Sequence, residues 1–178
     1  LSNFYGYRGS YINTSYTSEE EIDERESERP GSSAGMQVGW SEFTEDDLPY
    51  DIQGALVENF NVAGNLIGSK AAIYISPNAY VKNINILQGA AIAGDIVSEW
   101  NPNEIIYQNE DAEEAIAPLL PEDDDGLTNL NFNANLRYDY DILGKKSIIA
   151  NVQSNKLSLN GTVNVREFNV ATDATLCG

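Results

Sequence analysis

The stretch VKNINILQGAAIAGDIVSEW, residues 81–100, contains two short patterns that recur along the chain. Its first six residues read apolar-x-(Asn/Glu)-apolar-Asn-apolar, and the segment that follows reads apolar-x-x-(Gly/Asn/Asp)-Ala-x-apolar. Copies of the first pattern occupy residues 57–62, 81–86, 127–132 and 165–170, and copies of the second occupy 75–81, 86–92 and 170–176. Recurrence of short β-like units is typical of architectures built from stacked repeats.

The spacing inside the first pattern predicts a bent strand. Phe60 and Val62 are two residues apart, so they share one face of a strand. Val57 and Phe60 are three apart, so a flat strand could not bury both on one side. A strand that bends at residues 58–59 can bury both residues on one side. Asparagine suits such a bend, because it tolerates left-handed backbone angles and its amide hydrogen-bonds turn backbone.

The second pattern predicts a tight corner, because a Gly, Asn or Asp before the alanine lets the chain turn sharply. The two patterns lie about half a repeat apart, which implies coils of roughly 20–24 residues, a typical solenoid period. Stacked coils place equivalent residues above one another, so Asn59, Asn83 and Asn129 are expected to form an asparagine ladder. We therefore predict an all-β, parallel β-solenoid; an antiparallel sandwich with repetitive turns is the alternative fold.

The chain divides into two regions with an insertion. Residues 1–50 show no stable period, and the acidic, Ser- and Gly-rich stretch 18–35 predicts an exposed or disordered loop. Residues 51–178 carry the β-like pattern and form the predicted solenoid. Residues 101–126 interrupt this pattern with prolines and acidic clusters, so we predict an acidic loop insertion there, with a short helix near 110–117.

Aromatic residues offer two interpretations. Exposed, they could bind host glycans or proteins; packed against the first coil or a coil end, they would serve the core. We favour packing. The residues concerned are Tyr5, Tyr7, Tyr11, Tyr16, Trp40 and Trp100.

Composition excludes several classes of function. With 28 acidic and 10 basic residues the formal net charge is −18, which disfavours nucleic acid and anionic membranes as partners but permits weak divalent-cation binding. The chain has no histidine, so Ser-His-Asp and Cys-His catalysis, histidine metal sites and histidine pH switches are excluded within it. The lone Cys177 supports neither an internal disulfide nor a multi-cysteine metal site. We predict no cofactor and no metal ligands.

The sequence contains two candidate sites. Asp123-Asp124-Asp125-Gly126 superficially matches a calcium loop, but EF-hand spacing would put Pro121 first and Phe132 twelfth, so we favour solvated loop charge. Asp95 and Glu99 could form an acid/base pair beside Trp100, because side chains four apart in an extended segment face the same way. Asp95 follows a glycine at a predicted corner, so a turn role is favoured. We predict no catalytic residue and no enzymatic activity.

The segments VKNINILQGAAIAGDIVSEW (81–100) and LSLNGTVNVREFNVATDATLCG (157–178) resemble passenger domains of Gram-negative autotransporters. In that family, runs of the form Gly/Asp-Ala-x-apolar-x-Gly mark coils of a right-handed parallel β-helix. More narrowly, residues 52–100 resemble the solenoid that follows a subtilisin-like peptidase domain in some autotransporters. The resemblance does not extend to residues 1–50 or to the acidic insertion at 101–126, and its motifs are degenerate.

The resemblance implies a secreted or surface-displayed protein of the Gram-negative outer membrane, attached to the membrane only through a C-terminal barrel outside this chain. We predict a non-catalytic stalk or scaffold with an adhesin surface, in which loop 101–126 touches a host protein or glycan. One alternative is an accessory region downstream of a subtilisin-type peptidase whose triad lies elsewhere. The other is a carbohydrate-active β-helix.

The ends of the chain also carry expectations. The sequence begins at Leu1 rather than methionine and stops at Gly178 inside a recurring pattern, so we expect a processed or excised fragment. A truncated solenoid leaves open strand edges, so self-association at the solenoid ends is expected unless caps or neighbours cover them.

Overall fold

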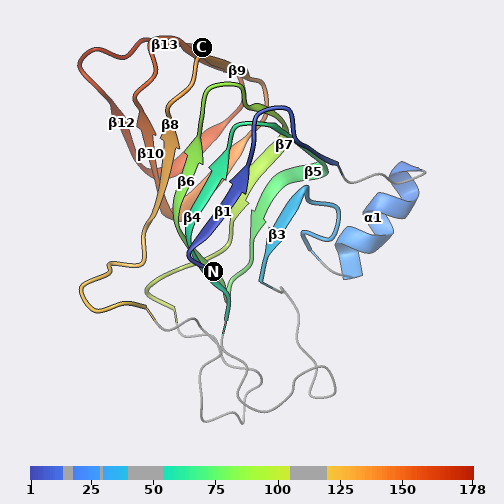
Figure 1. Cartoon of the computed structure of the whole chain (residues 1–178). Coiled ribbons are helices and arrows are strands. Elements are labelled where there is room, and N and C mark those ends of the chain that lie inside the picture. Colours follow the sequence, from blue (N-terminus) through green and yellow to red (C-terminus); the bar gives the residue numbers. More distant parts are fainter. Residues whose placement is uncertain (14–17, 29, 40–53, 105–119) are drawn as a thin grey trace.

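The computed structural model describes residues 1–13, 18–28, 30–39, 54–104 and 120–178 (Figure 1). The elements in chain order are β1 (Asn3–Gly6), β2 (Tyr11–Asn13), α1 (Glu19–Glu28), β3 (Met36–Val38), β4 (Leu56–Val62), β5 (Asn65–Ile75), β6 (Tyr80–Ile86), β7 (Ala91–Ser98), β8 (Thr128–Phe132), β9 (Leu136–Tyr138), β10 (Ile142–Val152), β11 (Leu157–Leu159), β12 (Val163–Val170) and β13 (Leu176–Cys177).

The strands form a curled sheet in which the neighbours run parallel (Figure 1). Its order is β1-β4-β6-β8-β10-β7-β5-β2, with β12 beside β10 and β3 beside β5. A smaller parallel sheet has the order β13-β11-β9. The predicted β class is therefore confirmed, and the long strands β5 and β10 bend so that each takes part in two regions of the sheet.

The register sets equivalent residues side by side. Phe60 of β4 faces Ile84 of β6, which faces Leu130 of β8, and the row continues through Ala150 of β10 to Phe168 of β12. Three copies of the first sequence pattern thus lie on the neighbouring strands β4, β6 and β8, and the fourth, in β12, is separated from them by β10. Inward positions of such rows form one apolar core, which also contains Val62, Ile86, Phe132, Val152, Leu66, Ile73, Ile75, Ile96, Tyr138 and Leu157.

The burial pattern of β4 is the one that the predicted bend requires, but the backbone does not turn at an asparagine as predicted. Val57 and Phe60 are both buried, while Glu58 between them is exposed and Asn59 is half-buried. β6 repeats this order. Asn59 nevertheless stays within the strand, and among the described non-glycine residues only Asp123 has a positive φ, of 65°. The bend therefore needs no left-handed asparagine.

The predicted corner turns are confirmed by a shared backbone hydrogen bond. The N–H of Ala79, Ala90 and Ala174 donates to the carbonyl three residues earlier, at 3.2, 3.0 and 3.0 Å. The three copies do not occupy the same corner, however: the first joins β5 to β6, whereas the other two follow β6 and β12. A similar local sequence therefore serves two different corners of the sheet.

An asparagine ladder runs along the outer surface. Asn83 Nδ2 donates to Asn59 Oδ1, and Asn59 Nδ2 donates to Asn3 Oδ1, both at 3.1 Å. Asn129 lies beside Asn83 in the register, as predicted. A second and longer ladder was not predicted. Each of its members donates an amide N–H to the one before at 2.9–3.1 Å, in the order Asn61, Asn85, Asn131, Asn151, Asn169.

The N-terminal region is more regular than the sequence predicted. β1, β2 and β3 all pair with the sheet, β1 through Phe4, whose ring stacks on Phe60 at 4.9 Å. The acidic stretch forms α1, because the Ser18 hydroxyl accepts the N–H of Glu21 at 3.2 Å and acidic side chains at a helix N-terminus are favourable. Lys70 of β5 pairs with Asp23 at 2.6 Å and attaches the helix to the sheet.

Two further predictions concern the aromatic residues and the acidic insertion. Tyr5 and Tyr7 do not pack into the core as we favoured; both are exposed, with ring centroids 4.5 Å apart. The predicted helix at 110–117, most of the acidic insertion, Tyr16 and Trp40 lie outside the described residues. Within the described ranges, no helix combines the length and apolar character that a membrane span requires.

The matched variants Phe60→Ala and Phe168→Ala test the stacked core. The two phenylalanines occupy the same row, but Phe60 is 2% exposed and Phe168 is 36% exposed. We expect Phe60→Ala to lower the free energy of unfolding by about 3–5 kcal/mol, because it empties a packed interior position. Phe168→Ala should cost about 1 kcal/mol or less. Urea unfolding followed by circular dichroism measures both, and equal losses would contradict the order of the row.

Candidate functional site

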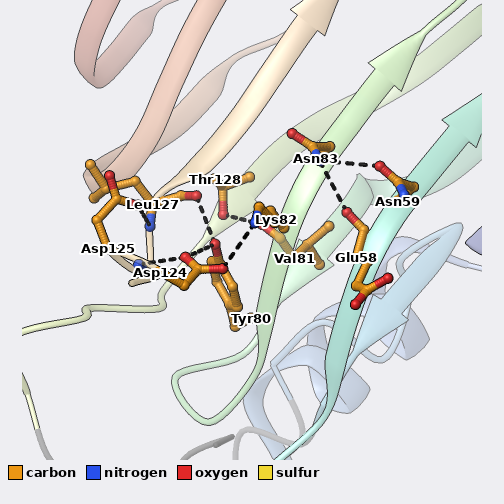
Figure 2. Close-up of polar contacts among 11 residues, drawn as sticks. Glu58, Asn59, Tyr80, Val81, Lys82, Asn83, Asp124, Asp125, Leu127 and Thr128 are labelled. Atoms are coloured by element: carbon orange, nitrogen blue, oxygen red, sulfur yellow. Dashed lines mark hydrogen bonds and ion pairs between the residues drawn. The ribbon is translucent and has the colours of Figure 1, made fainter. Parts of the chain in front are cut away.

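A polar pocket of about 270 Å³ lies where the acidic segment returns to the sheet (Figure 2). β4 and β6 provide its floor, and residues just before β8 provide one wall. Its lining residues are Leu56, Glu58, Asn59, Tyr80, Lys82, Asn83, Pro121 and Asp124. Because adjacent parallel strands present side chains in register, these groups from distant parts of the sequence converge at one place.

Asp124 is the most constrained residue of the pocket, with a side chain only 3% exposed. Its Oδ1 accepts the phenolic O–H of Tyr80 at 2.7 Å and the N–H of Gly126 at 2.9 Å. Tyr80 also reaches the carbonyl of Leu127 at 3.0 Å (Figure 2). These bonds tie the end of the acidic segment to the beginning of β6.

Lys82 supplies the charge that balances this buried carboxylate. Its Nζ lies 3.4 Å from Asp124 Oδ2, which otherwise has no hydrogen-bond partner among the described residues. Burial by itself raises the pKa of Asp124, but the bonds from Gly126 and Tyr80 and the charge of Lys82 outweigh it and hold that pKa below its usual 3.8. Burial and the neighbouring Asp124 carboxylate raise the pKa of Tyr80, which therefore stays protonated as a donor.

Trp100 closes the base of the acidic segment. Its indole N–H donates to the carbonyl of Gly126 at 2.8 Å, and its ring contacts Tyr80 with centroids 5.9 Å apart. Gly126 adopts a φ of +73°, and a Cβ there would lie 2.9 Å from Pro102. The two ends of segment 101–126 are therefore held together at one point of the sheet.

The rim of the pocket is set by the asparagine ladder. Asn83 Nδ2 donates to the carbonyl of Glu58 at 3.4 Å as well as to Asn59. The Glu58 side chain and Lys82 are exposed, so the pocket offers both a carboxylate and an ammonium group to solvent. This mixture can hydrogen-bond a small polar ligand. The acidic residues 123–125 do not gather as a metal site: within the described ranges, no group of three or more metal-ligating side chains occurs.

The Asp95, Glu99 and Trp100 hypothesis does not gain support from the geometry. Asp95 accepts the N–H of Asp141 at 2.9 Å, whereas Glu99 accepts the hydroxyl of Tyr74. Four residues of strand span ~13 Å, more than the ~5–10 Å that separates carboxylates in glycoside hydrolysis. Trp100 is buried, so it cannot provide the open stacking face that a bound sugar would need.

The residues that build the pocket were mostly missed from the sequence. Asp124 was noted only as part of a solvated acidic run, and Tyr80 and Lys82 carry no motif. One signal was available: no Lys or Arg occurs between Lys82 and Arg137, so Lys82 is the last cation before a long acidic stretch. A buried acid in that stretch needs a positive partner, and Lys82 and Arg137 are the two basic residues that flank the stretch along the chain.

Comparisons with protein-family models, with curated proteins and with solved structures find no match to this chain. The resemblance to autotransporter passenger domains thus stays a prediction that rests on the sequence patterns alone. The function has to be argued from the geometry described above.

The variant Asp124→Asn tests the buried ion pair through its pH dependence. The folded-state pKa of Asp124 lies below its ordinary 3.8, so its contribution to stability is fully present above that value and is lost as pH falls through the folded pKa. We therefore expect the wild type to be more stable than Asp124→Asn near pH 7, with the difference shrinking below about pH 4.

Thermal unfolding of both proteins from pH 7 to pH 3 measures this difference. Asp123→Asn is the matched control, because Asp123 is exposed and asparagine accepts its positive φ. The control should follow the wild type throughout. A constant difference between Asp124→Asn and the wild type across this range would show that the charge of Asp124 contributes nothing.

Proposed function

We propose that the chain is a rigid, non-catalytic scaffold that displays the acidic segment 101–126 to a binding partner, and that its curled sheet is a right-handed parallel β-helix. The parallel, in-register pairing supports this architecture, because each strand then lies directly against its equivalent in the next coil. The clamp formed by Trp100, Tyr80, Lys82 and Asp124 supports the display function.

The distances along the sequence support the β-helix. Paired asparagines are 24 residues apart between Asn59 and Asn83, and 20 residues apart between Asn131 and Asn151. Both values fit coils of roughly 20–24 residues. The step from Asn85 to Asn131 is 46 residues and contains the acidic segment. One coil has thus been lengthened by an insertion while the register on either side is kept.

The single observation that carries the proposed function is the fixed base of that insertion. The indole of Trp100 bonds to Gly126 at 2.8 Å, and Asp124 is bound by Tyr80 and Lys82. A segment with clamped ends loses less conformational freedom on binding than one with free ends, so it can bind more tightly. Its acidity favours a partner with a basic face, such as a host protein.

The biological setting we propose is that of an autotransporter passenger, displayed on or released from the surface of a Gram-negative bacterium. The sequence patterns at 81–100 and 157–178 motivate it, and parallel strand pairing is consistent with it. In this setting the sheet acts as a stalk, and residues 101–126 form the adhesive surface. A host protein or glycan is then the partner.

Replacing residues 104–119 by a Gly-Ser linker tests the display function. This variant keeps Trp100 and the whole Asp124 network, so we expect the fold to persist while binding to immobilised extracellular matrix from cultured epithelial cells falls at least tenfold. Fluorescently labelled protein measures binding. The linker removes five acidic residues, and a control variant replaces Glu19, Glu20 and Glu24 of α1 by glutamine to remove three acidic charges elsewhere.

Loss of binding in the linker variant alone is the expected result. Equal binding by the linker variant and the wild type would assign adhesion to another surface. Equal losses in the linker variant and the α1 control would mean that general acidity, rather than the displayed segment, is responsible.

A further inference from the structure

Two exposed residues of opposite charge occupy neighbouring positions on β4 and β6 without forming an ion pair. The register between these strands has no shift and sets Val57 opposite Val81, so the next residues, Glu58 and Lys82, are also neighbours. Opposite charges this close attract each other. The Lys82 ammonium nevertheless lies 3.4 Å from Asp124 Oδ2, on the other side of β6 from Glu58. Figure 2 shows Asp124 and Glu58 on opposite sides of Lys82.

The Glu58 carboxylate is left without a partner by this arrangement. Among the described residues it takes part in no hydrogen bond and no ion pair; only the backbone of Glu58 is bonded, to Leu1 and Asn83. Lys82 is 46% exposed in its side chain. An ammonium has three N–H donors, and Asp124 lies on only one side of it. An unpaired acceptor and a donor with N–H groups to spare therefore line the same pocket.

The charges in this pocket favour a neutral ligand. Glu58 and Asp124 carry one negative charge each and Lys82 carries one positive charge, so one negative charge is in excess. An anion would meet two carboxylates, and a cation would lie against the ammonium. A hydroxyl group avoids both conflicts, because its O–H donates to a carboxylate while its oxygen accepts from an ammonium. Hydrogen bonds to charged groups are about twice as strong as those between neutral groups.

The size of the pocket fits one sugar ring. Its volume is about 270 Å³, just below the ~300–1,000 Å³ of pockets that hold drug-sized ligands. Leu56 and Pro121 line it together with the charged groups. The C–H groups of a ring would thus meet apolar side chains, while the hydroxyls at its edge reach Glu58 and Lys82.

We propose that this pocket binds a single neutral pyranose that bridges Glu58 and Lys82 through two adjacent hydroxyls. One hydroxyl donates to the Glu58 carboxylate, and its neighbour accepts from the Lys82 ammonium. Asp124 is a positioning residue: it holds the ammonium on one wall and prevents it from closing on Glu58. The amides of Asn59 and Asn83 border the ring. The site does not rest on the display function, because all of these residues lie outside 104–119.

Titration of methyl glycosides into isotope-labelled protein, followed by NMR, tests the pocket. The probes are methyl β-D-glucoside, methyl β-D-galactoside and methyl α-D-mannoside, each added to about 50 mM, enough to saturate a site with a Kd of about 1 mM. Cyclohexanol is the matched control probe, because it has a six-membered ring but a single hydroxyl. We expect at least one glycoside to shift the amide signals of residues 58–59 and 82–83 in a saturable way, and cyclohexanol to shift none.

Variants assign the binding to the two charged groups. Glu58→Gln removes the acceptor charge at an exposed position, and we expect it to weaken glycoside binding about tenfold. The control Glu167→Gln removes an exposed carboxylate of β12 that does not line the pocket, and it should bind like the wild type. The double variant Lys82→Met with Asp124→Asn removes the ammonium without leaving a buried charge unpaired, and it should abolish binding. Circular dichroism checks that each variant folds.

The linker variant of residues 104–119 separates this site from the display function. It keeps every group named above, so it should bind the glycoside like the wild type even where its binding to matrix is lost. Loss of glycoside binding in this variant would assign the sugar to the replaced segment and overturn the proposal.

Three further results would overturn it. One is the absence of saturable shifts with any of the three glycosides. Another is equal binding by Glu58→Gln and the wild type, or equal binding of cyclohexanol and the glycosides. The third is a shift of the same signals by butylammonium but by no glycoside, which would assign the pocket to a basic side chain of a partner.

Discussion

Parallel pairing in a constant register places chemically similar side chains above one another throughout this molecule. On the inside, Phe60, Ile84 and Leu130 form a continuous apolar row, so each strand is covered by its neighbours on both sides. On the outside, the asparagines of the same strands bond to one another through their amides. A shift of one residue would turn the apolar row outward and break the amide chain. The register is therefore specified twice, once by burial and once by polar contacts.

This constraint explains how the chain carries an insertion without losing its fold. The strands on either side of residues 101–126 keep their register, and the return of the chain is fixed by a buried carboxylate, Asp124. A buried charge is costly unless it is paired and hydrogen-bonded. Here Tyr80 and Lys82 of β6 and the backbone of Gly126 meet that requirement. The same register that builds the core thus brings these groups to the place where the insertion ends.

The β class, the burial pattern of β4 and β6 and the corner turns could be predicted because their signals are local. Alternation, the three-residue parity break and a Gly, Asn or Asp before alanine can all be read within six or seven residues. β1 and the second half of β10 were missed because both depart from the first sequence pattern. In β1, Gly6 stands where the pattern has its last apolar residue, and in β10, Ile149 stands where the pattern has its first asparagine. α1 was missed because its high charge outweighed the Ser18 cap.

The pocket could not be predicted for a different reason. Tyr80 and Asp124 are 44 residues apart, and their contact depends on how an insertion returns to the sheet. No local pattern encodes such a distance. Trp100 was noticed as an aromatic residue of interest, but its role as the clamp on Gly126 emerges only when both ends of the insertion are in place.

Disulfide trapping across adjacent strands tests the parallel register most directly. In a Cys177→Ser background, Asn85→Cys with Asn131→Cys joins neighbours in the ladder, and Asn85→Cys with Asn151→Cys joins residues two strands apart. Adjacent strands lie ~4.8 Å apart and disulfides span Cα distances up to ~6.8 Å, so only the first pair should cross-link under mild oxidation. Efficient cross-linking of the first pair alone is the predicted result. Cross-linking of both pairs, or of neither, would contradict the register on which the whole account depends.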